Sequence, residues 1–176
     1  MKWASAVSEQ AHLEQAIEKC AAGVLSGLED ATPDLAVTFV SSHYEADYDN
    51  VARLVGQRLE PARVFGCSGG GIIGDGVEVE ERPAVSITGA NLPGVEIVDF
   101  HLGKDSLPDL DAGPGSWEEL IKVSSSQDPQ FVMLADPFSF PVQNLLMGLD
   151  FAFSQSAKIG ELASGAQQPG RNALFL

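Results

Sequence analysis

The sequence predicts an α/β fold: a mixed sheet or two-sheet sandwich that combines parallel strands with an antiparallel meander, flanked by helices. Up to Phe65, amphipathic segments alternate with short apolar runs, a pattern typical of strand–helix–strand units with parallel neighbours. Three alternating segments then follow one another between residues 77 and 100, which predicts the meander. The 176 residues, 44% of them apolar, are enough for one domain with a full core.

The first helix is predicted for residues 8–28, where apolar residues recur at helical spacing and Ser8 is placed to cap the N-terminus. The nearly continuous apolar run of residues 35–40 then predicts a buried strand. We expect its polar exit, residues 41–44, to be a loop. A second helix is expected for residues 47–59.

The next strand begins at Val64 and Phe65 and runs into a segment that is unusually rich in glycine, residues 66–76. Glycine has no Cβ, so the backbone of such a segment can approach a ligand or another strand closely. The two strands around the second helix are therefore expected to be parallel neighbours that end beside this segment.

The meander is predicted from residues 77–80, 84–90 and 95–100, each of which alternates apolar and polar side chains between turn signals. Asp, Pro and Gly dominate residues 103–115, which we expect to be a loop. The remaining predicted elements are a short helix at residues 117–123 capped by Ser116, a buried strand at 131–135, a helix at 141–154 and a strand at 158–163.

Residues 172–176 resemble a strand that has only begun, with no polar tail. We therefore expect a dangling or swapped last strand. We also expect that residues 1–176 are a single domain truncated before a C-terminal partner domain.

Composition excludes several classes of function. A formal charge of −15 argues against binding nucleic acid or an anionic membrane surface. No signal peptide or membrane-spanning run is evident, and Cys20 and Cys67 are far apart, so a reducing, cytoplasmic setting is the default. The spacing of His, Cys, Asp and Glu does not compel metal ligation, and no cofactor is expected.

The glycine segment matches two motifs without their structural context. Residues 69–74 fit G-x-G-x-x-G, but Gly74 and Gly76 would break the helix that must hold a pyrophosphate. Residues 66–70 fit G-x-S-x-G, which makes a hydrolase that uses Ser68 or Cys67 the competing hypothesis. A triad would need a base within hydrogen-bond reach of the nucleophile.

Polar residues follow three of the predicted buried strands. If these strands are parallel neighbours, their carboxyl ends meet at one edge of the sheet, the usual ligand crevice of an open α/β sheet. The candidate ligand-binding residues are Ser42, His43, Cys67, Ser68, Gly69 and Asp136.

The run from Gly66 to Ile72 (G-C-S-G-G-G-I) resembles the first motif of the FIST N-terminal domain family, and residues 164–176 resemble a later segment of that domain. Gly70 and Gly71 replace the usual acidic end of the motif, and Lys158 to Glu161 stand where a pair of glycines is more usual. The resemblance implies a sensory domain that binds small ligands, such as amino acids or related metabolites. It also implies a C-terminal FIST domain and a signalling output domain as partners.

These observations favour a cytoplasmic, small-ligand-binding sensory module in intracellular signal transduction, with no enzyme activity of its own. No catalytic residues are carried over from the family. Besides the hydrolase, a third hypothesis is a non-catalytic interaction scaffold that forms a homodimer through its truncated edge.

Overall fold

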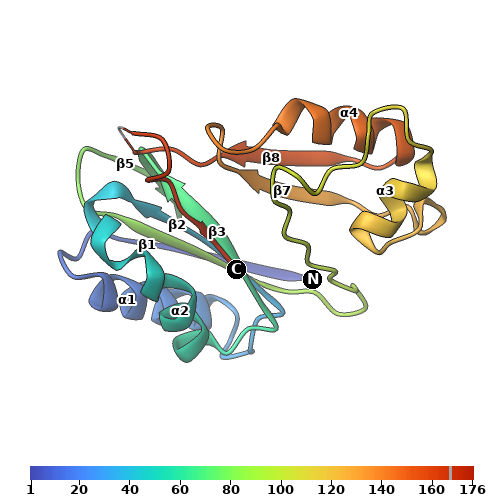
Figure 1. Ribbon diagram of the computed structural model, residues 1–176. Helices are drawn as coiled ribbons and strands as arrows, with labels where there is room; N and C mark the ends of the chain where they lie inside the picture. The colour runs from blue at the N-terminus through green and yellow to red at the C-terminus, as the bar shows by residue number, and fades with distance from the viewer. Residues whose placement is uncertain (167) are drawn as a thin grey trace. The chain divides into compact units, whose positions relative to one another are not determined.

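The computed structural model describes residues 1–166 and 168–176, which form two compact units (Figure 1). Unit 1 contains residues 1–95 and 163–176, and unit 2 contains residues 96–162. No helix in the described part of the chain is long and apolar enough to cross a membrane. That the two units act as a single domain stays a prediction.

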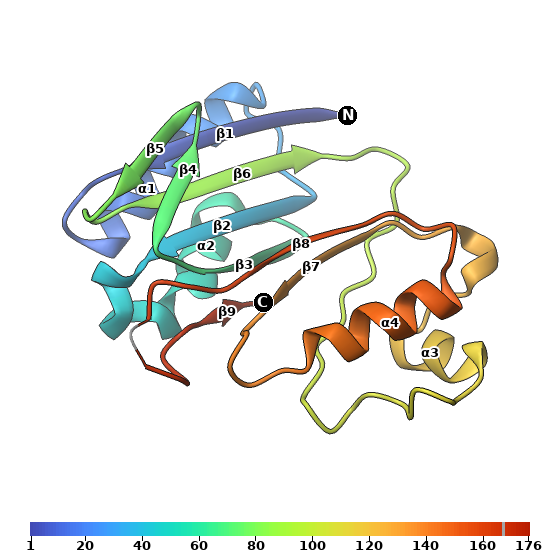
Figure 2. The same cartoon turned by 90° about the horizontal axis from the view of Figure 1, so that it is seen from above.

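Unit 1 is built on a five-stranded sheet in the order β1-β6-β2-β3-β9 (Figure 2). β2 and β3 are parallel, and the other neighbours are antiparallel, so the predicted α/β class with a mixed sheet is confirmed. The strands are β1 (Lys2–Ser8), β2 (Leu35–Ser41), β3 (Arg63–Gly69), β6 (Val85–Asn91) and β9 (Leu174–Phe175).

Two helices, α1 (Leu13–Gly27) and α2 (Val51–Leu59), cover one face of this sheet (Figure 1). α1 begins five residues after the predicted start, because Ser8 is the last residue of β1 rather than a helix cap. β1 was missed because its short side chains, alanine and serine, do not show the bulky alternation by which strands are recognised.

The other face of the sheet is partly covered by a hairpin of β4 (Gly71–Gly74) and β5 (Val77–Glu80), which buries Ile72 and Val79. The predicted meander is wrong in its pairing. β5 pairs with β4, β6 lies between β1 and β2, and residues 95–100 form no strand. Alternation identifies a strand but not its partner, because every half-buried strand shows the same period.

The segment expected to be a loop after β2 is instead the start of a 3-10 helix, η1 (Ser42–Asn50), and α2 follows it directly. Tyr44 explains this local structure. Its ring is buried in the core, and its hydroxyl donates a hydrogen bond to the Gln10 carbonyl oxygen, which anchors η1 to the chain before α1.

Unit 2 contains α3 (Pro114–Ile121), the short 3-10 helix η2 (Ser125–Gln127), β7 (Phe131–Ala135), α4 (Val142–Ala152) and β8 (Lys158–Leu162). Both predicted strands and both predicted helices are confirmed, although α3 begins earlier, at Pro114. Trp117 is fully buried among aromatic and leucine side chains. A Cβ at Gly148 would lie 2.0 Å from the Trp117 ring, so α4 needs glycine there to pack against α3.

β7 and β8 pair in parallel as a two-stranded sheet of their own. The expectation that β7 is a neighbour of β2 and β3 is therefore wrong. A run of apolar residues such as β7 predicts burial, and here α3 and α4 provide it.

The last strand is neither dangling nor swapped. Leu174 and Phe175 form β9, which pairs antiparallel with Cys67 and Gly66 of β3, and Phe175 is buried in the core under the helices. Its antiparallel partner lies more than a hundred residues earlier in the chain, so no local pattern reports the pairing.

Candidate functional site

The carboxyl ends of β2 and β3 lie side by side, as the sequence predicts for parallel neighbours. Ser41 is opposite Gly69 in the register. Ser42 and His43 follow β2; Ser42 is half-buried and His43 is exposed. The structure thus brings together five of the six predicted residues, those around the ends of these two strands.

The backbone and hydroxyl groups of Ser68 form hydrogen bonds with the C-terminal segment, which returns to pair with β3. Its amide donates to the Ala173 carbonyl oxygen at 2.9 Å, and its carbonyl accepts from the Ser164 amide at 3.0 Å. Its hydroxyl oxygen accepts from the Ala173 amide at 3.1 Å. With only 1% of its surface exposed, Ser68 binds the chain itself rather than presenting a nucleophile.

The glycines next to Ser68 allow two backbone segments to meet. A Cβ on Gly165 would lie 2.7 Å from the Gly69 carbonyl oxygen, and Gly165 has a φ of +90°. The Gly70 amide donates to the Ser164 hydroxyl at 3.1 Å. Of the two uses that a glycine-rich segment allows, close approach to a ligand or to another strand, the structure shows the second.

Neither motif interpretation of this segment finds its geometry. The chain after Gly70 continues as strand β4, so no helix follows to hold a pyrophosphate or to form a nucleophile elbow. Cys67 is buried in β3, opposite Phe39 of β2. Burial also raises the pKa of the other cysteine, Cys20, to about 12, which keeps its thiol protonated and unreactive.

Asp136, the sixth predicted residue, belongs to unit 2 and directly follows β7. Its carboxylate accepts a hydrogen bond from the Ser139 hydroxyl at 2.5 Å, and its carbonyl oxygen accepts from the Phe140 amide. These bonds shape the turn that leads into α4. A ligand-binding role for the six residues stays a prediction.

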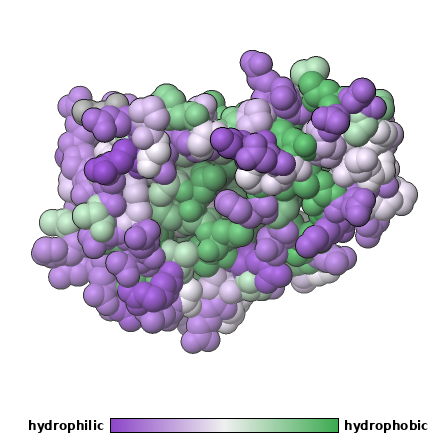
Figure 3. Space-filling model, viewed as in Figure 1, coloured by the Kyte–Doolittle hydropathy of each residue, from purple (hydrophilic) through white to green (hydrophobic). Residues whose placement is uncertain are grey.

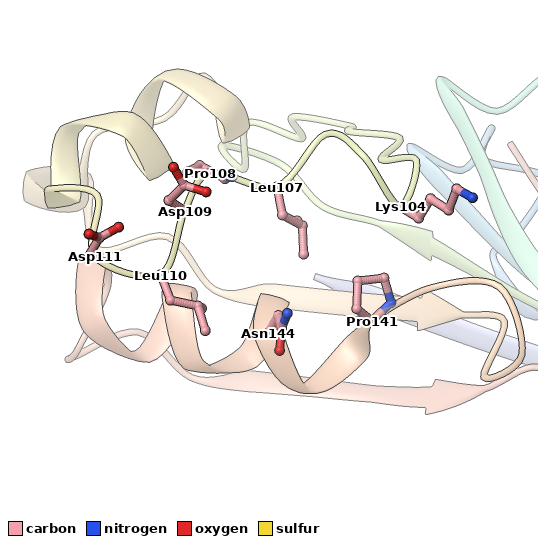
Figure 4. A pocket seen from close by; sticks show the side chains of 8 residues that line it. All are labelled: Lys104, Leu107, Pro108, Asp109, Leu110, Asp111, Pro141 and Asn144. Carbon is pink, nitrogen blue, oxygen red and sulfur yellow. The ribbon is translucent and has the colours of Figure 1, made fainter.

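A hollow of about 680 Å³ lies in unit 2, between the loop of residues 104–111 and the N-terminal half of α4 (Figure 4). Leu107 and Leu110 project from the loop toward the helix, with Lys104 and the acidic side chains toward opposite ends. The lining residues are Lys104, Leu107, Pro108, Asp109, Leu110, Asp111, Pro141 and Asn144.

Leucine side chains and charged side chains of both signs line this hollow, whose surface is more polar than apolar. Leu107 also packs against the buried cluster that contains Trp117. The N-terminus of α4 adds partial positive charge on the side of Pro141. Sequence reasoning missed the hollow because Asp, Pro and Gly between residues 103 and 115 indicate only a loop, and nothing local shows which helix that loop crosses.

Two further contacts of unit 1 were also missed. The Arg171 guanidinium pairs with the Glu45 carboxylate at 2.5 Å. The Tyr48 ring meets Phe175 edge-on at 5.7 Å. Both contacts tie η1 to the C-terminal segment, and burial raises the pKa of Tyr48 to about 12. The partners are more than a hundred residues apart, so no spacing signal could have identified them.

Comparison with known proteins agrees with the resemblance of the segment Gly66 to Ile72 to the FIST N-terminal domain family. The FIST N domain family model matches residues 34–176. Two uncharacterized proteins of Mycobacterium tuberculosis, from strains CDC 1551 / Oshkosh and ATCC 25618 / H37Rv, are each 30% identical to the chain over 170 residues. The match covers 96% of this chain but only 42% of each relative.

Proposed function

Because the chain belongs to the FIST N domain family, we propose that it is a sensory domain that binds a small ligand in intracellular signal transduction. The hollow of unit 2 is the observation that carries the proposal, since it offers a cation, carboxylates and leucines around one open space. A binding module is favoured over a hydrolase because Ser68 and Cys67 are buried, and Ser68 is hydrogen-bonded by the chain itself.

The charges of the hollow suit a zwitterion of the amino acid class. Lys104 and the N-terminus of α4 would attract a carboxylate, and Asp109 and Asp111 would attract an ammonium group. Leu107 and Leu110 would contact an apolar side chain between the two charged groups.

The test is a thermal-shift measurement with each of the twenty L-amino acids. A ligand at one hundred times its Kd stabilises the native state by about 2.7 kcal/mol, which corresponds to a Tm rise of about 5–10 °C for a protein of this size. The expected result is a rise for at least one amino acid that Lys104→Ala abolishes. If no amino acid raises the Tm, this ligand class is excluded.

His43→Ala is the matched control, because it alters the edge of the sheet in unit 1, the location that the sequence predicts. A rise that survives Lys104→Ala but is lost in His43→Ala would move the ligand to that edge. Localisation can be read from fluorescence. In a Trp3→Phe variant the buried Trp117 is the remaining tryptophan, and it reports on unit 2.

A second candidate function is an interaction scaffold. The sheet of unit 1 ends at β1 and β9, and edge strands can pair with another chain. Light scattering over a concentration range tests this, and a molecular mass that stays at 18.6 kDa throughout would exclude a homodimer.

A further inference from the structure

The outer face of α4 presents an apolar stripe, defined as Met147 and Phe151. Met147 and Phe151 are four residues apart, so their side chains are neighbours on the helix, and they are 60% and 57% exposed. Leu145 and Leu149, on the opposite side of α4, are buried in the core of unit 2. Figure 3 shows hydrophobic side chains set among hydrophilic ones in this region.

The stripe continues toward the hollow. Asn144 lies three residues before Met147 on α4, and it lines the hollow together with Leu110, which is itself half exposed. Figure 4 shows Leu110 projecting from the loop toward the helix. The side of α4 that carries Met147 and Phe151 therefore meets the hollow at Asn144.

Unit 2, which carries the stripe, is acidic as a whole. Unit 2 has eleven Asp and Glu residues against three Lys residues and no Arg. One of the lysines, Lys158, is mostly buried and pairs with Asp150, so it adds little positive potential outside. Asp109 and Asp111 line the hollow that Asn144 of the same helix also lines.

From this pattern we propose that the stripe on α4 binds a basic amphipathic helix of a partner protein. An apolar helix face with neighbours four residues apart is the geometry that receives the apolar side of another helix. The acidic charge of unit 2 attracts lysine and arginine on the flanks of that helix and disfavours acidic partners. A second copy of this chain is a poor occupant, because two molecules of charge −15 repel one another.

Partner binding at this surface would transmit the state of the ligand site to a downstream protein. Pro141 and Asn144 line the hollow, and Met147 and Phe151 follow on the same helix, so ligand and partner would contact one rigid element. Only this regulatory part rests on the proposed function, since helix binding needs no small ligand.

The test is fluorescence anisotropy with a synthetic 18-residue peptide of leucine and lysine at helical spacing. The controls are a peptide with glutamate in place of lysine and a scrambled peptide that is not amphipathic. The amphipathic basic peptide should bind, and both controls should bind at least tenfold more weakly. Equal binding of the glutamate peptide would overturn the charge argument, and equal binding of the scrambled peptide would overturn the helix argument.

The double variant Met147→Gln, Phe151→Gln should raise the Kd at least tenfold, because exposed aromatic and methionine anchors carry much of such an interface. Ile73→Gln, at an exposed apolar residue of β4 in unit 1, is the matched control and should leave the Kd unchanged. Equal loss in both variants would contradict the proposal. Hydrogen exchange of the wild-type protein gives a second measure that needs no variant, and absence of added protection in α4 would also contradict it.

If the peptide binds but no amino acid raises the Tm, the helix-binding proposal stands and only the small-ligand function is contradicted.

Discussion

Gly165 shows how a single residue holds the site of unit 1 together. Its positive φ and its contact with the Gly69 carbonyl both require the absence of a side chain. The glycine-rich sequence thus serves a backbone-to-backbone crossing, and Ser68 completes it with hydrogen bonds to Ala173.

Gly165→Ala should destabilise the protein by about 3 kcal/mol, because a left-handed backbone and a clash with backbone both oppose a Cβ. Gly170→Ala is the control. It has a φ of +78° but open space around it, so only the backbone strain of about 1 kcal/mol applies. Urea denaturation of both variants measures the difference, and equal losses would show that the crossing contributes nothing.

At the scale of elements, the short strand β9 depends on one side chain. Phe175 inserts into the core between sheet and helices and meets Tyr48, while Leu174, its neighbour, lies on the other face and is 41% exposed. Two paired residues alone would form a weak strand, so packing rather than hydrogen bonding holds it in place.

Phe175→Ala should therefore cost about 3 kcal/mol and release β9, whereas Leu174→Ala should cost less than about 1 kcal/mol. Hydrogen exchange reports the release through loss of protection at the Ser68 amide, whose acceptor is the Ala173 carbonyl. Retained protection in Phe175→Ala would mean that Ser68 and Ser164 hold the segment without the ring.

Across unit 1, three ionisable side chains, one thiol and two phenols, have raised pKa values. Burial raises the pKa of Cys20, Tyr44 and Tyr48 to about 12 each. The unfolded chain releases these protons at lower pH, from the ordinary values of 9.0 for the thiol and 10.0 for the phenols. The contribution of these three groups to the free energy of unfolding is therefore fully present below pH 9. It decreases as the pH rises toward 12.

The tyrosines give a direct measurement. The chain has two, so absorbance at 295 nm should stay flat in the native protein at pH 10, where the urea-unfolded protein is half ionised. A native titration midpoint near pH 10 would contradict the burial of Tyr44 and the partial burial of Tyr48. Cys20→Ala should reduce the alkaline loss of stability between pH 9 and pH 12.

Local pattern was a reliable guide to strands and helices. The apolar runs at β2 and β7 and the periodicity of α4 each predicted an element that the structure contains, because side-chain burial repeats with the period of the backbone. The local pattern failed in β1, where the side chains are small. It also failed in η1, where the tertiary contact of Tyr44 with Gln10 orders the chain.

The candidate site shows the same division. Adjacent ends of β2 and β3 follow from the strand–helix–strand order, so that juxtaposition was predictable. The engagement of Ser68 by Ala173 and the position of the hollow against α4 were not, since each joins segments far apart in the chain.

By itself, therefore, the sequence determined the α/β class, most of the elements, the parallel pair and the glycine segment as a place where the backbone can approach a ligand or another strand. Only the tertiary structure decided what meets it, which is the returning segment that contains Gly165 and Phe175. The physical reason is that period and propensity are properties of neighbours in the chain, while strand partners and hollows depend on which distant surfaces bury one another.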